Sequence, residues 1–393
     1  MANIISNGVK RVLIFSTAYF PFVGGAEVAV KEITDRISDI EFDMVTARMN
    51  VKLPKFERLG NINVYRIGIG WPIFDKLILA FGGAKFAKKL HKKNKYGAIW
   101  AIMASFGGLA AGIFKKKNPE VKFLLTLQEG DNLAEVERKM ALSKRKFKSI
   151  FTGADYVQAI SNYLAAWAQK MGAVCPIEVV PNGVNFNQLS INNYKFSIND
   201  FKKKLGFGEN EKAVITVSRL VKKNGVSDLI EAMKNINAKL IVCGVGEKEN
   251  KLRKLAKSLD IEDKILFLGH IPYDELPKYY AAADVFCRPS LTEGLGNVFL
   301  EAMAAGVPVI ATPVGGIPDF LKDPSASSER ATGWFCGVKN PESIAEKIKL
   351  ILDEKNTALR QWVINNAREM VKEKYEWDKI AKRMDNIFNK LIF

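Results

Sequence analysis

Histidine and cysteine are scarce in this 393-residue sequence, which has two histidines and four cysteines. Neither His91 nor His270 lies near a cysteine and no Cys-x-x-Cys pair occurs, so a zinc site or a histidine-based nucleophile relay would lack parts. The apolar run from Leu240 to Cys243 is typical of a buried free thiol, and scattered, unpaired cysteines are typical of a reducing compartment. We therefore expect a cytoplasmic protein with no metal site.

Long hydrophobic runs are also scarce. The residues before Arg11 contain too short an apolar stretch for a signal peptide, which argues against secretion. The longest apolar run covers residues 98–114 and lies at the lower limit of what spans a bilayer. Phe106-Gly107-Gly108 within it favours a turn between a buried strand and a helix.

Basic residues outnumber acidic residues. The sequence contains 59 Lys and Arg and 42 Asp and Glu, which gives a net charge of +17. Residues 81–150 alone contain 16 Lys and Arg against 5 Asp and Glu. The basic residues of this segment include Lys85, Lys88, Lys89, Lys92, Lys93, Lys95, Lys115 to Lys117, Lys139, Lys144, Arg145, Lys146 and Lys148. Such a cluster attracts an anionic membrane surface, and a set of solvated helix faces is the alternative. No RNA-binding motif accompanies it, so we expect no nucleic-acid partner.

Short β-rich apolar runs alternate with amphipathic helical stretches from end to end, which is the pattern of βα units in a parallel sheet. Strands are predicted in the first half at residues 11–16, 43–46, 64–67, 99–103, 123–127, 156–160 and 177–180. In the second half they are predicted at 213–218, 240–243, 265–268, 285–288, 307–311 and 333–335. The chain is longer than one hydrophobic core usually supports, so we predict an α/β protein with two Rossmann-like domains.

The strand–helix pattern lapses over residues 181–200, an Asn-rich polar stretch that suits a domain boundary. We predict one domain over residues 1–185 and a second over residues 186–375. The last helical stretch, residues 376–393, carries Ile380, Met384, Ile387, Phe388 and Leu391 at spacings of three and four. Such a helix needs a surface to pack on.

The most informative stretch runs from Arg288 to Leu321 and joins a strand end to a Gly-rich turn, a helix, another strand and a Gly-Gly turn. Gly294 and Gly296 allow close approach of a ligand, and the helix beginning near Asn297 points N–H groups and partial positive charge outward. A diphosphate would fit there. Glu301 lies among apolar residues and needs hydrogen-bond donors, such as sugar or ribose hydroxyls. An ordinary strand–loop–helix with surface acids is the alternative.

The spacing of two acids in this stretch, Glu293 and Glu301, resembles the Glu-x7-Glu signature of family 4 of the retaining glycosyltransferases, which have the GT-B fold. The resemblance implies that Glu301 binds the ribose of a nucleotide and that Glu293 binds the transferred sugar. The donor phosphates would meet the segment Gly294, Leu295, Gly296, Asn297 and Val298. The resemblance also implies that two Rossmann-like domains face each other across a cleft. The first would be acceptor-side and the second would bind the nucleotide-sugar, with helix 376–393 crossing back to the first.

Further segments extend the resemblance over nearly the whole chain. Gly24-Gly25 is similar to the family's first-domain loop that faces the donor phosphates and the acceptor; taken alone, it is a tight βα turn. Val180 to Asn185 is similar to the family's VPNGVD segment, with Asn185 in place of Asp. In the segment from Val217 to Gly225, the family's diphosphate clamp has an Arg and, five residues later, a Lys.

The clamp segment and the acceptor segment both depart from the family pattern. Arg219 fits the clamp, but position 224 is Asn224, so the second positive charge would come from Lys223 or Lys222. In the first domain, Gln128 stands where many members have His. Glutamine can donate a hydrogen bond but cannot shuttle a proton at neutral pH. Glu129 and Asp131 would bind the acceptor or cap the next helix.

The implied activity is a metal-independent, retaining transfer of a sugar from a nucleoside-diphosphate-sugar to a hydroxyl of a glycan or lipid-linked acceptor, with no other cofactor. Arg219, a neighbouring lysine and the helix start would stabilise the charge that grows on the β-phosphate. No Asp-x-Asp motif occurs, which argues against a divalent metal. The basic residues in 81–150 would hold the enzyme on the inner face of a membrane.

Two other functions are compatible with parts of the sequence. An NAD-type oxidoreductase is suggested by Gly244-Val245-Gly246 after a strand, although Glu249 stands where the fingerprint needs its third glycine. A non-enzymatic protein that binds anionic membrane surfaces is suggested by the charge alone.

Overall fold

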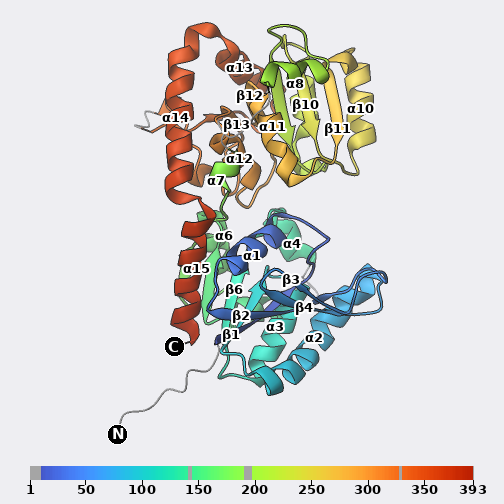
Figure 1. Cartoon of the computed structure of the whole chain (residues 1–393), viewed down its shortest axis with the longest axis vertical. Coiled ribbons are helices and arrows are strands. Elements are labelled where there is room, and N and C mark those ends of the chain that lie inside the picture. Colours follow the sequence, from blue (N-terminus) through green and yellow to red (C-terminus); the bar gives the residue numbers. More distant parts are fainter. Residues whose placement is uncertain (1–9, 140–143, 190–196, 327–329, 393) are drawn as a thin grey trace. The chain divides into compact units, whose positions relative to one another are not determined.

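The computed structural model describes residues 10–139, 144–189, 197–326 and 330–392 (Figure 1). The chain divides into a first unit, Met1–Asn182 with Trp377–Phe393, and a second unit, Gly183–Glu376. The division lies three residues before the boundary predicted from the sequence. Residues 140–143 of the basic segment and 190–196 of the Asn-rich stretch lie outside the described residues, as do the residues before Lys10.

The first unit is built on an eight-stranded sheet of order β3-β4-β2-β1-β5-β6-β7-β8. Its strands are β1 (Lys10–Ser16), β2 (Ile40–Ala47), β3 (Phe56–Leu59), β4 (Ile62–Ile67), β5 (Ala98–Ile102), β6 (Lys122–Leu127), β7 (Tyr156–Ala159) and β8 (Ile177–Val179). All seven predicted strands are confirmed. The sequence prediction missed β3, which pairs antiparallel with β4 across the turn at Gly60 and leaves alternate residues exposed.

Helices cover both faces of this sheet. They are α1 (Gly25–Asp35), α2 (Pro72–Asn94), α3 (Phe106–Lys117), α4 (Leu133–Lys139), α5 (Lys144–Thr152), α6 (Asn162–Lys170) and α15 (Trp377–Ile392). The apolar run 98–114 forms β5 and α3, as predicted, with the turn at residues 103–105. Within the described ranges, no helix combines the length and the apolar character needed to cross a bilayer.

The C-terminal helix α15 packs on the first unit, which confirms the prediction that it crosses back. It contacts α1, β5 and β6. The ring of Phe388 lies 5.1 Å from that of Trp100 and 5.7 Å from that of Phe42, centroid to centroid, inside one buried cluster. At the surface, Arg36 Nε donates to Asp378 Oδ1 over 2.7 Å. The apolar side of this helix is therefore part of the first unit's core.

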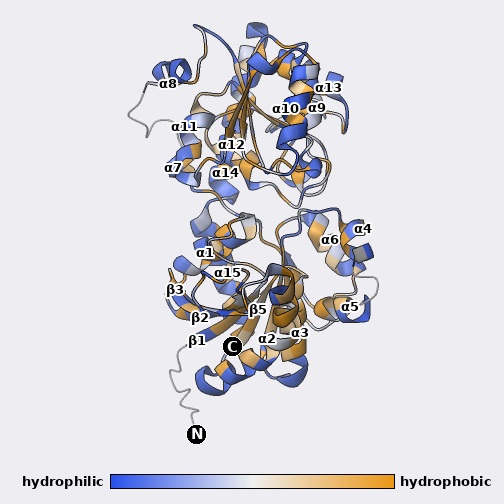
Figure 2. Cartoon of the chain, turned by 90° about the vertical axis from the view of Figure 1, so that its right-hand side faces the viewer, coloured by the Kyte–Doolittle hydropathy of each residue, from blue (hydrophilic) through white to orange (hydrophobic). Residues whose placement is uncertain are grey.

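The second unit is built on a six-stranded parallel sheet of order β11-β10-β9-β12-β13-β14. Its strands are β9 (Ala213–Val217), β10 (Lys239–Cys243), β11 (Ile265–Gly269), β12 (Val285–Arg288), β13 (Val309–Ala311) and β14 (Trp334–Phe335). Its helices are α7 (Phe186–Leu189), α8 (Ile198–Lys204), α9 (Val226–Met233), α10 (Glu249–Ser258), α11 (Leu276–Ala281), α12 (Asn297–Ala304), α13 (Pro341–Leu352) and α14 (Thr357–Lys374). All six predicted strands are confirmed. Figure 2 shows the strands of both units as the hydrophobic interior.

Each sheet grows outward in both directions from a central strand. In the first unit β1 lies between β2 and β5, and in the second unit β9 lies between β10 and β12. The loops after the two diverging strands leave in opposite directions, which opens a crevice at the carboxyl edge where α/β proteins bind ligands. Gly24-Gly25 follow β1, whereas Arg219 follows β9 and Glu293 follows β12. The fold thus brings the clamp segment and the acidic motif to one edge of the second sheet.

Candidate active site

The start of helix α12 is open to solvent at the carboxyl edge of the second sheet. Gly296, Asn297 and Val298 are partly exposed, while Leu295 before them is buried. Gly296 has φ +89°, and a Cβ there would lie 2.5 Å from the ring of Phe299, so this turn needs glycine. Within α12, no acidic residue lies in the first turn. The N–H groups and the helix dipole at this point therefore favour a bound anion.

An ion pair lies directly beside this helix start. Arg288 Nη2 donates to Glu293 Oε2, and the two side chains are only 7% and 13% exposed. Arg288 Nε also donates to Ser290 Oγ over 3.1 Å, and its guanidinium lies 4.5 Å from the Phe299 ring centroid. Glu293 Oε1 accepts from the N–H of Gly294 over 3.0 Å. The first acid of the motif is therefore held in place by an arginine whose role the sequence analysis did not identify.

The second acid, Glu301, is buried, and its Oε2 accepts from the hydroxyl of Tyr280 over 2.9 Å. Burial raises the pKa of Glu301 to about 7, while the hydrogen bond from Tyr280 and the charge of Arg288 act in the opposite direction. The sequence predicted ribose hydroxyls as donors to this carboxylate. The structure shows that the protein itself supplies one donor, Tyr280, from α11.

The clamp segment lies against the acidic loop. The carbonyl of Lys223 accepts from the N–H of Leu291 over 2.6 Å, two residues before Glu293. Asn224 is buried, and its Nδ2 donates to the carbonyl of Arg219 over 2.7 Å. Asn224 therefore shapes the loop from inside it. Arg219 and Lys222 are exposed and Lys223 is partly exposed, so all three cations of the segment border solvent.

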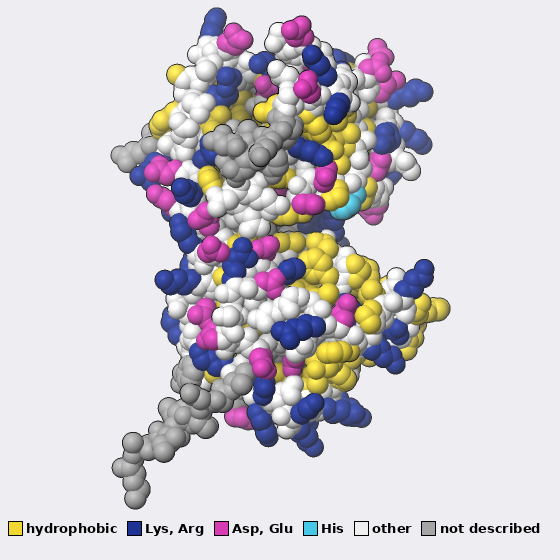
Figure 3. Space-filling view, in the orientation of Figure 1, with side chains coloured by type: hydrophobic (Ala, Val, Ile, Leu, Met, Phe, Trp, Pro, Cys, Tyr) yellow, Lys and Arg dark blue, Asp and Glu magenta, His cyan; other side chains and the backbone are white. Residues whose placement is uncertain are grey.

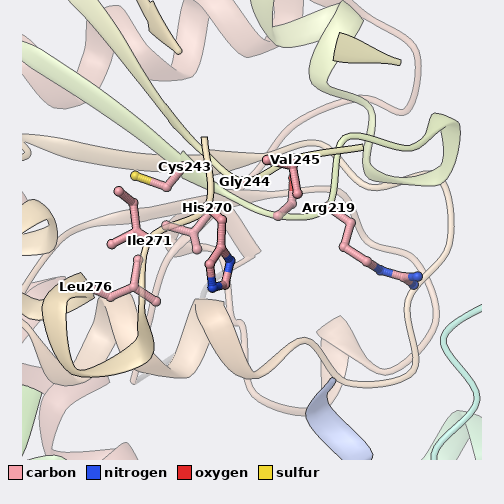
Figure 4. Close-up of a pocket in the computed structure, with 9 residues that line it drawn as sticks. Arg219, Cys243, Gly244, Val245, His270, Ile271 and Leu276 are labelled. Atoms are coloured by element: carbon pink, nitrogen blue, oxygen red, sulfur yellow. The ribbon is translucent and has the colours of Figure 1, made fainter. Parts of the chain in front are cut away.

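A pocket of about 220 Å³ adjoins the clamp segment. It is lined by residues at or just after the ends of three neighbouring strands, β9, β10 and β11, together with Leu276 at the start of α11. Figure 4 shows Ile271 and Leu276 gathered around the His270 ring, while the side chain of Arg219 extends to the opposite side. The sequence analysis missed the role of His270 and Ile271, because the only signal for them was their position just after a predicted strand. The size and the apolar walls of this pocket suit a flat ring that lies beside a phosphate site.

The glycines that suggested an NAD site have another role. Gly244 has φ +138°, and a Cβ there would lie 1.9 Å from the carbonyl oxygen of Ser218. These glycines thus let the loop after β10 approach the loop after β9, and Leu220 N donates to Val245 O over 2.9 Å. A dinucleotide fingerprint belongs after the central first strand, and here that strand is β9, which is followed by Ser218-Arg219-Leu220.

The predicted acceptor-side residues lie at the carboxyl edge of the first sheet, together with Gly24-Gly25, which we predict to face the donor phosphates. Gly24 and Gly25 are exposed at the start of α1, but Glu27 in the first turn already supplies a carboxylate. This helix start is therefore a weaker phosphate site than that of α12. Gln128 is partly exposed, and its Oε1 accepts from Asn182 Nδ2 over 3.1 Å, whereas Asp131 is exposed.

Glu129 lies inside the first unit and does not cap the next helix. Its side chain is buried, and Oε1 accepts from the N–H of Ala104 over 2.6 Å. Burial raises its pKa to about 7, against the lowering effect of backbone hydrogen bonds. Asn132 caps α4 by accepting from the N–H groups of Ala134 and Glu135, so the interpretation of Glu129 as a helix cap is wrong. Glu129 joins the loop after β6 to the loop after β5.

Comparisons with known proteins agree with this geometry. The family model Glycosyltransferase Family 4 matches residues 23–188, and Glycosyl transferases group 1 matches residues 197–370. The glycosyltransferase MJ1607 of Methanocaldococcus jannaschii, itself uncharacterized, is 31% identical in an alignment that covers 96% of this chain and 97% of the relative. The N-acetyl-alpha-D-glucosaminyl L-malate synthase of Bacillus anthracis is 32% identical over 94% of each chain. The motif match in the sequence therefore extends to whole-chain similarity.

Among solved structures, sucrose-phosphate synthase from Thermosynechococcus elongatus superimposes with a TM-score of 0.83 over 97% of this chain and 99% of that chain. Its sequence identity is 22%, so this likeness concerns the fold. That fold consists of two parallel-sheet α/β units, the GT-B arrangement.

Proposed function

The chain belongs to the family 4 glycosyltransferases of the GT-B fold, and on that premise we propose that it is a retaining, metal-independent hexosyltransferase. The proposed donor is a nucleoside-diphosphate-sugar, and the proposed acceptor is a hydroxyl of a glycan or of a lipid-linked sugar. No further cofactor takes part in the proposed reaction. The proposed location is the cytoplasm, because all four cysteines are unpaired.

One observation carries the proposal for the donor. The start of α12 is partly exposed, has no acid in its first turn, and lies beside the loop that carries Arg219, Lys222 and Lys223. A diphosphate at this edge would meet backbone N–H groups from one side and cationic side chains from the other. Glu301 would accept from ribose hydroxyls, and Glu293 would accept from the transferred sugar.

In the proposed reaction the bond between the sugar's anomeric carbon and the β-phosphate oxygen breaks, and its electron pair stays on the departing diphosphate. The acceptor oxygen bonds to the same face of the anomeric carbon, and its proton leaves with the diphosphate. The task of the protein is to stabilise the charge that grows on the β-phosphate. Arg219, Lys223 and the helix start act on that charge, while the acids orient the sugar and the ribose.

The acceptor is the less constrained half of the proposal. The malate synthase is named for a small acceptor, and the residues around Gln128 and Asp131 of this chain favour hydroxyl groups without selecting one acceptor. Attachment to the inner face of an anionic membrane through the basic residues of 81–150 is part of the proposal. The described lysines of that segment are largely exposed on α2, α3 and α5.

Thermal unfolding in the presence of UDP-, GDP- and ADP-sugars tests the donor proposal. One nucleotide class is expected to raise the melting temperature selectively, because a ligand that binds only the folded state stabilises it. Arg219→Ala is expected to weaken that donor by about tenfold or more, since hydrogen bonds to charged groups contribute about 1.5–3 kcal/mol.

The matched control is Arg58→Ala, which removes an exposed arginine from β3 in the first unit and should leave donor binding unchanged. NMR of the product's anomeric configuration and activity in EDTA test retention and metal independence. If no nucleotide-sugar stabilises the protein, the proposed activity is wrong.

A further inference from the structure

Helix α2 and the residue before it expose a group of large apolar side chains on the first unit. This α2 apolar patch consists of Trp71, Ile73, Phe74, Leu77, Ile78 and Phe81, which are 37% to 75% exposed. In Figure 3, hydrophobic side chains gather on the surface over α2, and Lys and Arg side chains border them. An exposed apolar patch of this kind in a soluble domain marks an interaction surface.

The patch is additional to the face by which α2 packs on its own unit. The buried side of α2 contains Leu79, Ala80, Gly83, Ala84 and Ala87, and the helix contacts α3, β2 and β4 through its packed side. The patch residues at 73, 74, 77, 78 and 81 follow the other stripe at helical spacing. Folding of the first unit therefore does not require these side chains to be apolar.

Hydrogen bonds hold the first turn of α2, where the patch begins, in a defined shape. Asp75 is fully buried and accepts from the N–H groups of Ile69 and Gly70, each over 2.7 Å, and of Met49 over 2.9 Å. These bonds tie two loops to the first turn of α2. The ring of Trp71 lies 6.2 Å from that of Phe74, centroid to centroid. A patch that is ordered before it binds loses little conformational entropy on binding.

The surroundings of the patch are basic. Further along the same stripe of α2 the exposed residues are Lys85, Lys88, Lys89 and Lys92. On the other side, Lys146 of α5 lies 5.3 Å from the centroid of the Phe81 ring, and Lys144, Arg145 and Lys148 of that helix are exposed. The only acidic residue of α2 is the buried Asp75, and α5 has none.

We propose that the α2 apolar patch inserts into the headgroup and upper acyl region of an anionic bilayer, while the lysines of α2 and α5 contact lipid phosphates. Aromatic and aliphatic side chains bordered by lysines are the composition of interfacial membrane-binding helices. Each lysine near an anionic surface adds to the attraction, whereas the same lysines would repel a second copy of this chain. The positive charge around the patch therefore favours binding to an anionic membrane over association with a second copy of this chain.

The patch also lies at the edge of the sheet where the candidate acceptor residues are found. Helix α2 begins just after the carboxyl end of β4, and β4 is parallel to β2 and β1 within the same sheet. Gly24-Gly25, after β1, share that edge. Insertion of the patch would therefore bring this edge to the headgroups, where a lipid-linked acceptor would present its hydroxyl; this last step rests on the proposed function.

Co-sedimentation of the full chain with unilamellar vesicles tests the inference. We expect binding to phosphatidylcholine vesicles that contain about one-third phosphatidylglycerol to be at least about tenfold tighter than to phosphatidylcholine alone, and to weaken as salt shortens the Debye length. The combined variant Ile73→Ser, Phe74→Ser and Phe81→Ser should lose about tenfold in binding to the anionic vesicles. The fluorescence of Trp71 should shift to the blue on binding, and Trp71→Phe should remove that shift.

The matched control is Leu359→Ser with Trp362→Ser, which removes two exposed apolar side chains from α14 of the second unit and should leave vesicle binding unchanged. The assay contains neither donor nor acceptor, so its result is independent of the proposed transferase activity. Equal binding of the wild type and the triple variant would overturn the inference. So would a dimer that the triple variant abolishes, seen by sedimentation velocity without any vesicle binding.

Discussion

Replacing Glu301 by glutamine should make the second unit more stable at alkaline pH while it weakens nucleotide binding. Burial raises the pKa of this carboxyl to about 7 from an ordinary value of 4.5. The folded state therefore holds the proton more tightly than the unfolded chain does. Between these two pH values the unfolded chain binds fewer protons, so the stability of the wild type falls as pH rises.

The size of the effect follows from that pKa difference. One pKa unit corresponds to about 1.4 kcal/mol, so an ionised Glu301 destabilises the folded unit by about 3 kcal/mol at pH 8. Glutamine has no charge to bury, and its carbonyl can still accept from Tyr280. For a domain of this size 1 kcal/mol shifts the melting temperature by about 2–4 °C, so Glu301→Gln should raise it by about 6–12 °C at pH 8.

The assay is thermal unfolding of the wild type and Glu301→Gln from pH 5 to pH 8. A nucleoside diphosphate identifies the transition of the second unit, because that transition should shift on binding. The difference between the two proteins should be largest at pH 8 and fall to about a quarter of that size at pH 5, where the folded side chain is neutral but the unfolded one is still mostly ionised. Binding of the nucleotide should be weaker in the variant, because an amide oxygen accepts less strongly from ribose hydroxyls than a carboxylate does.

The control is Glu231→Gln, which removes an exposed carboxylate from α9 of the same unit and should change the melting temperature by less than about 2 °C at every pH. A stabilisation by Glu301→Gln that does not vary with pH would refute the linkage argument. Unchanged nucleotide binding in this variant would refute the assignment of Glu301 to the ribose.

Four further substitutions test the rest of the second-unit site. Arg288→Met should lower the free energy of unfolding of that unit by about 3 kcal/mol, because it leaves the Glu293 carboxylate without its buried partner. Adding Glu293→Gln should recover part of this loss. Fully additive effects of the two substitutions in denaturant titrations would contradict the pairing. Glu293→Gln alone should reduce kcat by about tenfold or more with little change in nucleotide affinity, measured by steady-state kinetics and calorimetry. Lys223→Ala should weaken nucleoside-diphosphate binding by about tenfold and Lys222→Ala by much less; the reverse order would assign the clamp charge to Lys222.

The sequence alone determined the positions of all strands but one, the C-terminal helix and the family. Strands and helices depend on local preferences and on the period with which apolar residues recur, and both can be read along the chain. All thirteen predicted strands therefore appear, and the apolar stripe of residues 376–393 forms the buried side of α15. The missed strand, β3, is a four-residue edge segment with little burial, so it has only a weak periodic signal.

Tertiary structure decided which side chains meet. Arg288 pairs with Glu293 and Tyr280 bonds to Glu301 because neighbouring elements of one sheet place them together, and no sequence spacing specifies such a contact. Glu129 turns inward to Ala104 for the same reason.

The α2 patch is the clearest example of what the sequence could not decide. Apolar residues are generally expected inside the core, but α2 carries more apolar residues than the packed side of the helix can bury. Burial depends on which faces of α2, α3 and the sheet come together, and that is set by contacts far apart along the chain. Only the folded structure separates the side chains that pack inside from those that remain on the surface. Leu79, Ala80, Ala84 and Ala87 belong to the first group, and Trp71, Ile73, Phe74, Leu77, Ile78 and Phe81 belong to the second.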